Sequence, residues 1–187
     1  MILTDREIQV AIDVSQIIIS PRPDASAYSS TSLDLTLSNS IQEWERTADG
    51  IEPQVVDPGA RGYSYNEFAK KFSEKKTISD RGYTLEPQGF ILGWTQEKIE
   101  LPVNSRLAAR VEGKSSLARI GLGVHITAPT IHAGFKGTIQ LEICNHGTLA
   151  VRLRPNMPVC QLILEQTLGT PVKGYEGQFY GQTAHRS

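Results

Sequence analysis

Short runs of apolar residues alternate with polar turns along the whole chain. Residues 33–37 and 138–143 place leucine or isoleucine at every second position, which is the period of a strand with one buried face. This alternation predicts a mainly β protein, built as a barrel or a sandwich. Further strands are expected at the apolar runs 17–19, 90–95, 106–112, 149–153 and 159–164, with turns rich in glycine, proline and asparagine between them.

Two short helices are predicted in the N-terminal half. Thr4 and Ser64 are each followed three residues later by a glutamate, Glu7 and Glu67, and this spacing is typical of a capping box at the start of a helix. Apolar residues at helical spacing follow each box. Because of their serine, glycine, proline and aspartate content, a turn is expected at 38–40 and a loop at 46–62.

Composition and charge narrow the class of protein. We expect a single domain over residues 1–187, with a C-terminal tail from about residue 169 that is mobile or folded over a ligand. The formal net charge of −1 gives no overall attraction to nucleic acid or to an anionic membrane, so any anion site must be local. Cys144 and Cys160 lie in apolar runs and are interpreted as buried thiols of a reducing compartment. With no membrane-length apolar run and no signal peptide, the predicted location is the cytoplasm.

Two stretches carry candidate chemistry. A glycine at 113 precedes two cations and two hydroxyls, Lys114, Ser115, Ser116 and Arg119, a set that suits a polyanion such as a triphosphate. Glu142 lies between buried aliphatic residues in the strand predicted at 138–143. Such a carboxylate is either a paired structural acid or a working base.

Several common chemistries are excluded. The residues at 113–115 resemble the end of a P-loop, but Ala108 stands where its first glycine is required. The His-x-Glu and Pro-Cys-x-x-Cys pair of zinc deaminases is absent, and so is the Gly-x-Ser-x-Gly of serine hydrolases. The four histidines show no metal-ligand spacing. For Ser115 to act as a covalent nucleophile, a general base would have to activate it, and the sequence does not identify one.

Four segments together resemble a known family. Residues 113–119, followed by 124–128, 134–137 and 140–142, are similar to the dCTP deaminase family of the trimeric dUTPase superfamily. The resemblance spans nearly the whole chain, since 3–8, 32–35 and 87–90 also fit the family's pattern.

The resemblance implies a fold, an assembly and a reaction. The expected fold is a distorted dUTPase-like β-barrel with short N-terminal helices, assembled as a homotrimer with active sites between subunits. The expected reaction is hydrolytic deamination of dCTP to dUTP and ammonia, on the path to dUMP. No protein-bound metal is expected, and Mg²⁺ accompanies the triphosphate. The expected partners are dCTP as substrate, dUTP as product and dTTP as a candidate inhibitor.

The resemblance also assigns roles to residues. Glu142 would be the general base that activates water, with Ser115 and Arg119 holding the water and the pyrimidine. The phosphates would be held by Lys114, Ser116 and the backbone of Leu117 and Ala118. The remaining substrate contacts would come from main-chain groups of Gln140 and Leu141 at the cytosine, from Gln161 near the sugar and phosphate, and from Tyr175 and Gln182 in the tail, with Gln178 as a competing tail assignment.

Two departures from the family pattern keep alternatives open. His132 stands where many members carry an aspartate that binds the sugar hydroxyl and orients the water for attack on phosphate. The basic residue that is common in the tail is not clearly present, although Lys173 is close. The alternatives are a bifunctional dUMP-forming deaminase or dUTP diphosphatase, and a non-catalytic deoxynucleotide-binding regulator.

Overall fold

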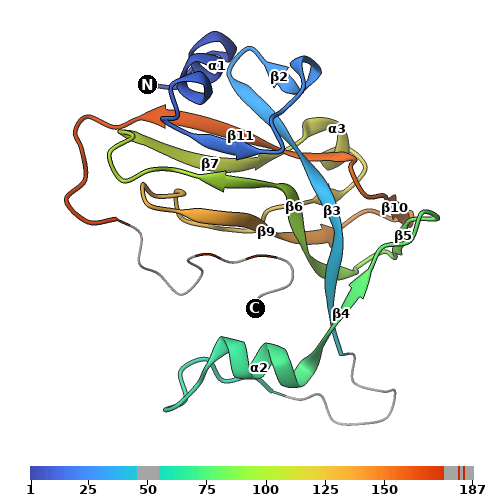
Figure 1. Ribbon diagram of the computed structural model, residues 1–187. Helices are drawn as coiled ribbons and strands as arrows, with labels where there is room; N and C mark the ends of the chain where they lie inside the picture. Colours follow the sequence, from blue (N-terminus) through green and yellow to red (C-terminus); the bar gives the residue numbers. More distant parts are fainter. Residues whose placement is uncertain (46–54, 175–180, 182, 184–187) are drawn as a thin grey trace, which may run out of the picture.

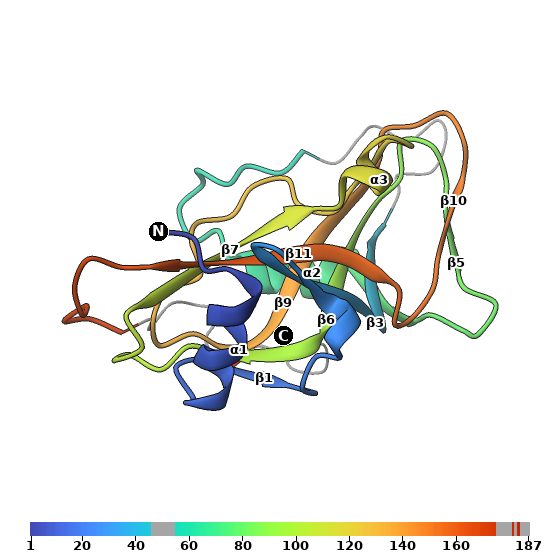
Figure 2. The ribbon, with the colours of Figure 1, turned by 90° about the horizontal axis from the view of Figure 1, so that it is seen from above.

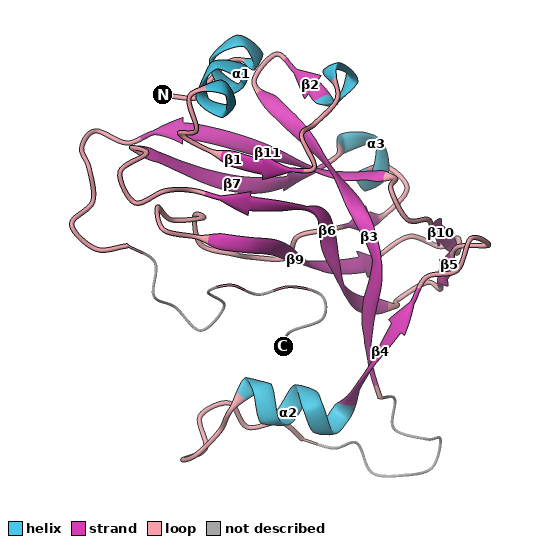
Figure 3. Cartoon of the chain, in the orientation of Figure 1, coloured by secondary structure: helices cyan, strands magenta, loops and turns pink. Residues whose placement is uncertain are grey.

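A nine-stranded antiparallel sheet forms most of the protein and curls into a nearly closed barrel (Figure 1). The computed structural model describes residues 1–45, 55–174, 181 and 183. The main hydrogen-bonded order is β7 (Leu107–Gly113), β11 (Pro158–Gln166), β3 (Ser32–Trp44), β6 (Phe90–Glu100), β9 (Lys136–Asn145) and β8 (Leu122–Gly123). The predicted mainly β barrel is therefore confirmed, and Figure 3 shows how little of the described chain is helical.

Shorter strands complete the sheet and extend from it. Two strands pair with β3, namely β2 (Tyr28–Ser29) and β4 (Ser73–Thr77), and β1 (Ile18–Ser20) pairs with β6. A separate two-stranded ribbon, β5 (Tyr83–Leu85) with β10 (Val151–Leu153), lies at one edge of the molecule (Figure 2).

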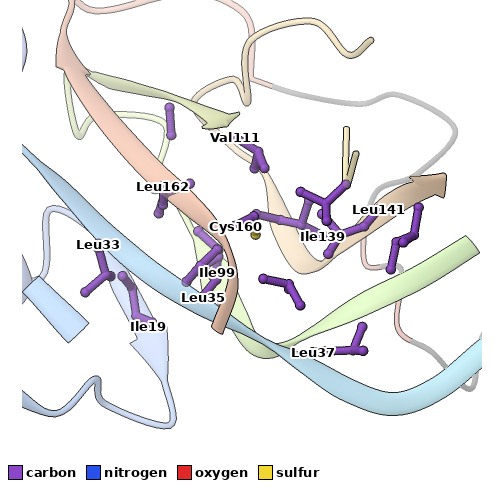
Figure 4. Close-up of a cluster of buried hydrophobic side chains, with 14 of the residues drawn as sticks. Ile19, Leu33, Leu35, Leu37, Ile99, Val111, Ile139, Leu141, Cys160 and Leu162 are labelled. Atoms are coloured by element: carbon purple, nitrogen blue, oxygen red, sulfur yellow. The ribbon is translucent and has the colours of Figure 1, made fainter. Parts of the chain in front are cut away.

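The alternating strands supply the core, as their period predicts. Leu33, Leu35 and Leu37 of β3 are fully buried. In β9, Ile143 is also fully buried and Leu141 is 1% exposed. All five belong to one buried hydrophobic cluster, in which Figure 4 labels the three leucines of β3 and Leu141. Each fully buried leucine or isoleucine stabilises the fold by about 1.5–3 kcal/mol, so the strands are held in a single register by this face.

The helices begin where their capping residues predict. In α2 (Tyr65–Phe72), the Ser64 hydroxyl accepts a hydrogen bond from the Glu67 backbone N–H at 3.5 Å. In α1 (Asp5–Asp13), the Thr4 hydroxyl instead donates to the Glu7 carboxylate, so the start is right but the bond differs from a capping box. The structure adds a single turn, α3 (Ser115–Ala118), and a 3-10 turn (Ala25–Ala27).

The turn predicted at 38–40 is wrong, because β3 continues to Trp44. Ser38 and Ser40 are each only 7% exposed, and the Ser38 hydroxyl accepts from the Ser40 backbone N–H at 3.1 Å. The pairing of β3 with β6 shifts register between Leu37 and Ile41, so a bulge absorbs the polar run without ending the strand. Of the loop predicted at 46–62, residues 46–54 lie outside the described part, and 55–62 contain neither helix nor strand.

The long second half of β3 carries α2 away from the barrel. β4 pairs with it from Ser40 opposite Thr77 to Trp44 opposite Ser73, and α2 ends where β4 begins. In Figure 1, α2 stands apart from the barrel on the side of β9. No helix among the residues that the structure describes is long and apolar enough to cross a membrane.

Candidate functional site

Glu142 lies on β9, on the face opposite the core. Its neighbours Leu141 and Ile143 point into the barrel, so the two-residue period directs Glu142 outward. Its side chain is 29% exposed. One carboxylate oxygen, Oε2, accepts a hydrogen bond from the Ile126 backbone N–H at 3.4 Å and lies 3.8 Å from His125 Nδ1. Among the described residues no lysine or arginine forms a salt bridge with it, and His125 is its only charged or titratable neighbour in an ion-pair contact.

A pocket of about 550 Å³ opens beside Glu142, and we call it the Glu142 pocket. Its volume falls in the range of small-molecule sites. Its walls are mostly apolar, and Glu142 is the only carboxylate among the described lining residues. The pocket is lined by Trp44, Tyr65, Phe90, Leu92, residues 127–132, Phe135, Ile139, Gln140 and Glu142.

The negative charge of Glu142 acts on its neighbours. Burial raises the pKa of the Tyr65 hydroxyl above its usual value of 10.0, and the Glu142 carboxylate raises it further. The pKa of the Cys144 thiol is raised by burial and secondly by Glu142. The Tyr65 hydroxyl therefore stays protonated at neutral pH, and Tyr65 lines the same pocket as the acid.

A second group of polar residues surrounds α3, and we call it the α3 cluster: Asp34, Lys114, Ser115, Ser116, Arg119 and Gln161. The Lys114 ammonium forms a salt bridge with one oxygen of Asp34, and the Gln161 amide donates to the other at 3.0 Å. Both charged side chains are largely covered, with 23% of Lys114 and 17% of Asp34 exposed. Ser115, Ser116 and Arg119 are exposed on the single turn of α3.

The chain that leaves α3 leads directly to the contacts of Glu142. Gly121 has a φ of +86°, and a Cβ at this position would lie 2.3 Å from the backbone nitrogen of Gly147. The His146 N–H donates to the Gly121 carbonyl at 2.8 Å. After this close approach β8 pairs with the end of β9, and the chain then reaches Ile126. Within the described residues, however, no hydrogen bond or salt bridge joins Glu142 to Ser115 or Arg119.

The structure thus separates the predicted site residues into two groups. Gln140 and His132 line the Glu142 pocket, and His132 also lines an adjoining pocket of about 520 Å³ with Lys173. Leu141 is 1% exposed and does not line the pocket within the described residues. Lys114, Ser115, Ser116, Arg119 and Gln161 belong to the α3 cluster, with Leu117 and Ala118 on the same turn, while Tyr175, Gln178 and Gln182 lie outside the described residues.

Sequence reasoning missed Asp34, Trp44 and Tyr65. Asp34 had a signal, because it occupies the polar face of the alternating stretch 33–37, but its pairing with Lys114 spans 80 positions. Trp44 and Tyr65 reach the pocket only through the extension of β3 and the placing of α2. The described residues contain no group of three or more histidine, cysteine, aspartate or glutamate side chains that could hold a metal ion.

Comparison with known proteins gives the family. A family model described as dCTP deaminase-like matches residues 2–167. A protein of Marinomonas sp. (strain MWYL1) named dCTP deaminase is 35% identical over 177 residues, which cover 94% of this chain and 88% of that protein. A protein of Methanosphaera stadtmanae named dCTP deaminase, dUMP-forming, is 31% identical over 187 residues, which cover 97% of this chain and 90% of that protein.

A solved structure has the same fold. The crystal structure of the 2'-deoxycytidine 5'-triphosphate deaminase from Agrobacterium tumefaciens matches with a TM-score of 0.65 at 22% identity. The match covers 88% of this chain and 48% of that one, so this chain spans about half the length of that protein. At this level of identity the likeness shows the fold alone.

Proposed function

This chain belongs to the dCTP deaminase-like family, and from that premise we propose that it deaminates dCTP to dUTP with release of ammonia. The observation that carries the proposal is Glu142 itself. It is a partly covered carboxylate without a lysine or arginine partner among the described residues, and it lies at the wall of a pocket large enough for a nucleoside.

Glu142 would act as the general base. It accepts a proton from a water molecule, whose oxygen forms a bond to C4 of the cytosine ring. Glu142 then returns the proton to the exocyclic nitrogen, the C4–N4 bond breaks, and ammonia leaves. Its position supports this role, because the contacts of Glu142 within the described chain use Oε2 and leave Oε1 to bind water.

The α3 cluster would bind the triphosphate, which arrives with Mg²⁺. Ser115, Ser116 and Arg119 are exposed, and Arg119 forms no salt bridge with any residue that the structure describes. Lys114 is held by Asp34, which compensates part of its charge. The resemblance gives Arg119 to the water and the pyrimidine, and Lys114 to the phosphates. Because Lys114 is already paired with Asp34, we propose instead that Arg119 makes the main cationic contact with phosphate and Lys114 a smaller one.

We also propose a homotrimer in which the α3 cluster of one copy completes the Glu142 pocket of another. The absence of a hydrogen bond or salt bridge between the two groups within one described chain supports this arrangement. Three large apolar side chains near them, Ile120, Ile126 and Leu149, are more than half exposed and would be covered on assembly. Tyr175 and Gln182, or Gln178 in its place, would close over the nucleotide, and dTTP would compete at the same site.

One alternative has a specific observation in its favour. The relative from Methanosphaera stadtmanae is named as dUMP-forming, which requires cleavage of the triphosphate after deamination. That second step needs a group to orient water at the phosphate. His132 occupies the position at which the resemblance expects the aspartate, and the described lining of the pocket offers no carboxylate besides Glu142. We therefore propose deamination without pyrophosphate release.

One assay tests the proposal. The purified protein is incubated with dCTP and Mg²⁺, and ammonia and pyrophosphate are measured in the same samples. We expect ammonia in equal amount to dUTP and no pyrophosphate. Ammonia together with pyrophosphate would replace the proposal by the dUMP-forming alternative. Tight binding of dCTP with neither product would overturn it in favour of a regulator.

A further inference from the structure

Among the described residues, four aromatic side chains line the Glu142 pocket without a role in the mechanism above, and two of them, Trp44 and Tyr65, contact each other. Trp44 is the last residue of β3, and Tyr65 is the first residue of α2. Their ring centroids are 6.3 Å apart, with the planes at 68°, so the edge of one ring meets the face of the other. Both rings line the pocket that contains Glu142, and both are half-buried.

A cluster of aromatic residues behind the pocket holds these rings in place. Phe68 packs against Trp44 with 5.5 Å between ring centroids. Phe72 and Tyr63 contact Phe68 in turn, at 4.8 Å and 6.3 Å. None of these three is among the residues that line the Glu142 pocket. Trp44 thus lines the pocket and is packed against Phe68 outside it, so its ring is held in place before a ligand binds.

The same pocket carries the reactive acid, which comes from a different strand. Glu142 and Gln140 come from β9, and the aromatic surface comes from β3 and α2. A pocket that combines aromatic side chains with a carboxylate suits a planar heteroaromatic ring. The aromatic side chains cover the ring face, and the carboxylate then meets an atom at the ring edge.

We propose that Trp44 and Tyr65 form an aromatic wall against which the pyrimidine ring of the nucleotide packs, so that C4 is held toward Glu142. This inference rests on the proposed function. It adds a base-binding surface supplied by α2, a helix that stands outside the barrel. Because α2 packs mainly through the aromatic cluster and β4, changes at the wall leave the barrel core intact.

Steady-state kinetics of three leucine variants test the wall. Loss of one ring that stacks on a base weakens binding by roughly ten-fold or more. We therefore expect Trp44→Leu and Tyr65→Leu each to raise the KM for dCTP by about that factor. Tyr63→Leu is the matched control, because Tyr63 belongs to the same aromatic cluster and does not line the pocket, and its KM should equal that of the parent. Inhibition by inorganic tripolyphosphate, which lacks a base, should be the same in all four proteins.

Fluorescence provides a readout that does not depend on turnover. The chain has two tryptophans, and the other one, Trp94, is 1% exposed in β6. We expect dCTP to quench Trp44 in the parent and in Glu142→Gln, and the quench to disappear in Trp44→Phe. Trp44→Phe keeps an aromatic ring, so its KM should rise less than that of Trp44→Leu.

The outcomes separate this inference from the proposed function. A folded Trp44→Leu or Tyr65→Leu with the parent's KM would overturn the wall, and so would an equal loss in Tyr63→Leu or an equal loss of tripolyphosphate inhibition. If Trp44→Leu fails to fold, Trp44→Phe and Tyr65→Leu still decide the question. A parent protein that shows the Trp44 quench but releases no ammonia would support the wall and overturn the deaminase.

Discussion

The Glu142 pocket and the α3 cluster differ in the polarity of their side chains. The pocket has apolar and aromatic walls around a single described carboxylate, and it is supported by strands of the sheet. The α3 cluster is polar and stands on one helical turn, with Ser115, Ser116 and Arg119 exposed to water. A base that must accept a proton gains from partial removal of water, whereas a triphosphate with its counterions is bound by hydrated charges at a surface. This difference supports the proposal that the nucleobase binds in the pocket and the phosphates bind at the α3 cluster.

Breaking the pocket should have the largest effect on catalysis. Glu142→Gln keeps the shape of the side chain and removes its ability to accept a proton. General base catalysis contributes about 10²–10⁴-fold, so we expect ammonia release to fall by at least that much while dCTP still binds. Ammonia assays and calorimetric binding measure the two effects. Turnover at the parent rate would show that Glu142 is not the base.

Removing a charge from the α3 cluster should have a smaller effect on activity, and the effect should be on the binding of dCTP. A hydrogen bond to a charged group contributes about 1.5–3 kcal/mol, so Arg119→Ala should raise the KM for dCTP by roughly ten-fold to a hundred-fold. Because Arg119 is exposed, the thermal midpoint should not change. Arg110→Ala is the matched control, since this arginine is on the surface of β7 and pairs with Glu165 at 2.5 Å. Equal kinetic losses in both variants would remove Arg119 from the site.

The connection between the two regions can be broken at a glycine. Gly121→Ala places a Cβ against the backbone of Gly147 in a left-handed conformation that costs about 1–3 kcal/mol by itself. We expect the free energy of unfolding to fall by at least that amount, as measured by urea denaturation. Gly169→Ala, where a Cβ meets nothing within 4 Å, should leave stability unchanged. A Gly121→Ala protein as stable as the parent would contradict the close approach of the backbone at Gly121 to the backbone at Gly147.

One buried thiol lies near each region: Cys144 near Glu142, and Cys160 near Asp34 and Lys114. Both should make the stability of the protein depend on pH. Burial is the main cause that raises the pKa of Cys144 and of Cys160 above the usual value of 9.0. Well below pH 9 both thiols are protonated in the folded and the unfolded chain. Above pH 9 the unfolded chain loses these protons first, so the free energy of unfolding should fall, by up to about 1.4 kcal/mol per pH unit for each thiol. Urea titrations between pH 8 and 10 measure how steeply the free energy of unfolding falls with pH. This fall should be less steep in Cys144→Ala and in Cys160→Ala. An unchanged fall would contradict the raised pKa of the thiol that was removed.

The sequence alone predicts features that depend on nearby residues, such as the alternation of apolar and polar positions in a strand. The alternation at 33–37 and 138–143 predicts the buried faces of β3 and β9, and Ser64 predicts the start of α2. The family resemblance names Glu142 and Gln140 of the pocket and most of the α3 cluster, and the family model confirms the family itself. The individual catalytic roles stay predictions.

What the sequence does not predict depends on distant contacts. The run 38–40 has the composition of a turn, but pairing with β6 and β4 keeps it in β3. The strand β4 consists of serine, lysine, glutamate and threonine, so it has no apolar period to detect. Asp34 reaches Lys114, and Trp44 meets Tyr65, only after the sheet has formed. The aromatic wall is therefore a feature of the folded chain and not of any motif.

Subunit complementation tests the central claim most directly, namely that a working site combines the Glu142 pocket of one copy with the α3 cluster of another. Glu142→Gln and Arg119→Ala are co-expressed in equal amounts, and deamination of dCTP is measured. In randomly mixed trimers about a quarter of the sites would receive both intact halves, so we expect about a quarter of the parent activity. Activity no higher than that of the separate variants would contradict the account, because it would place both halves of the site in the same chain.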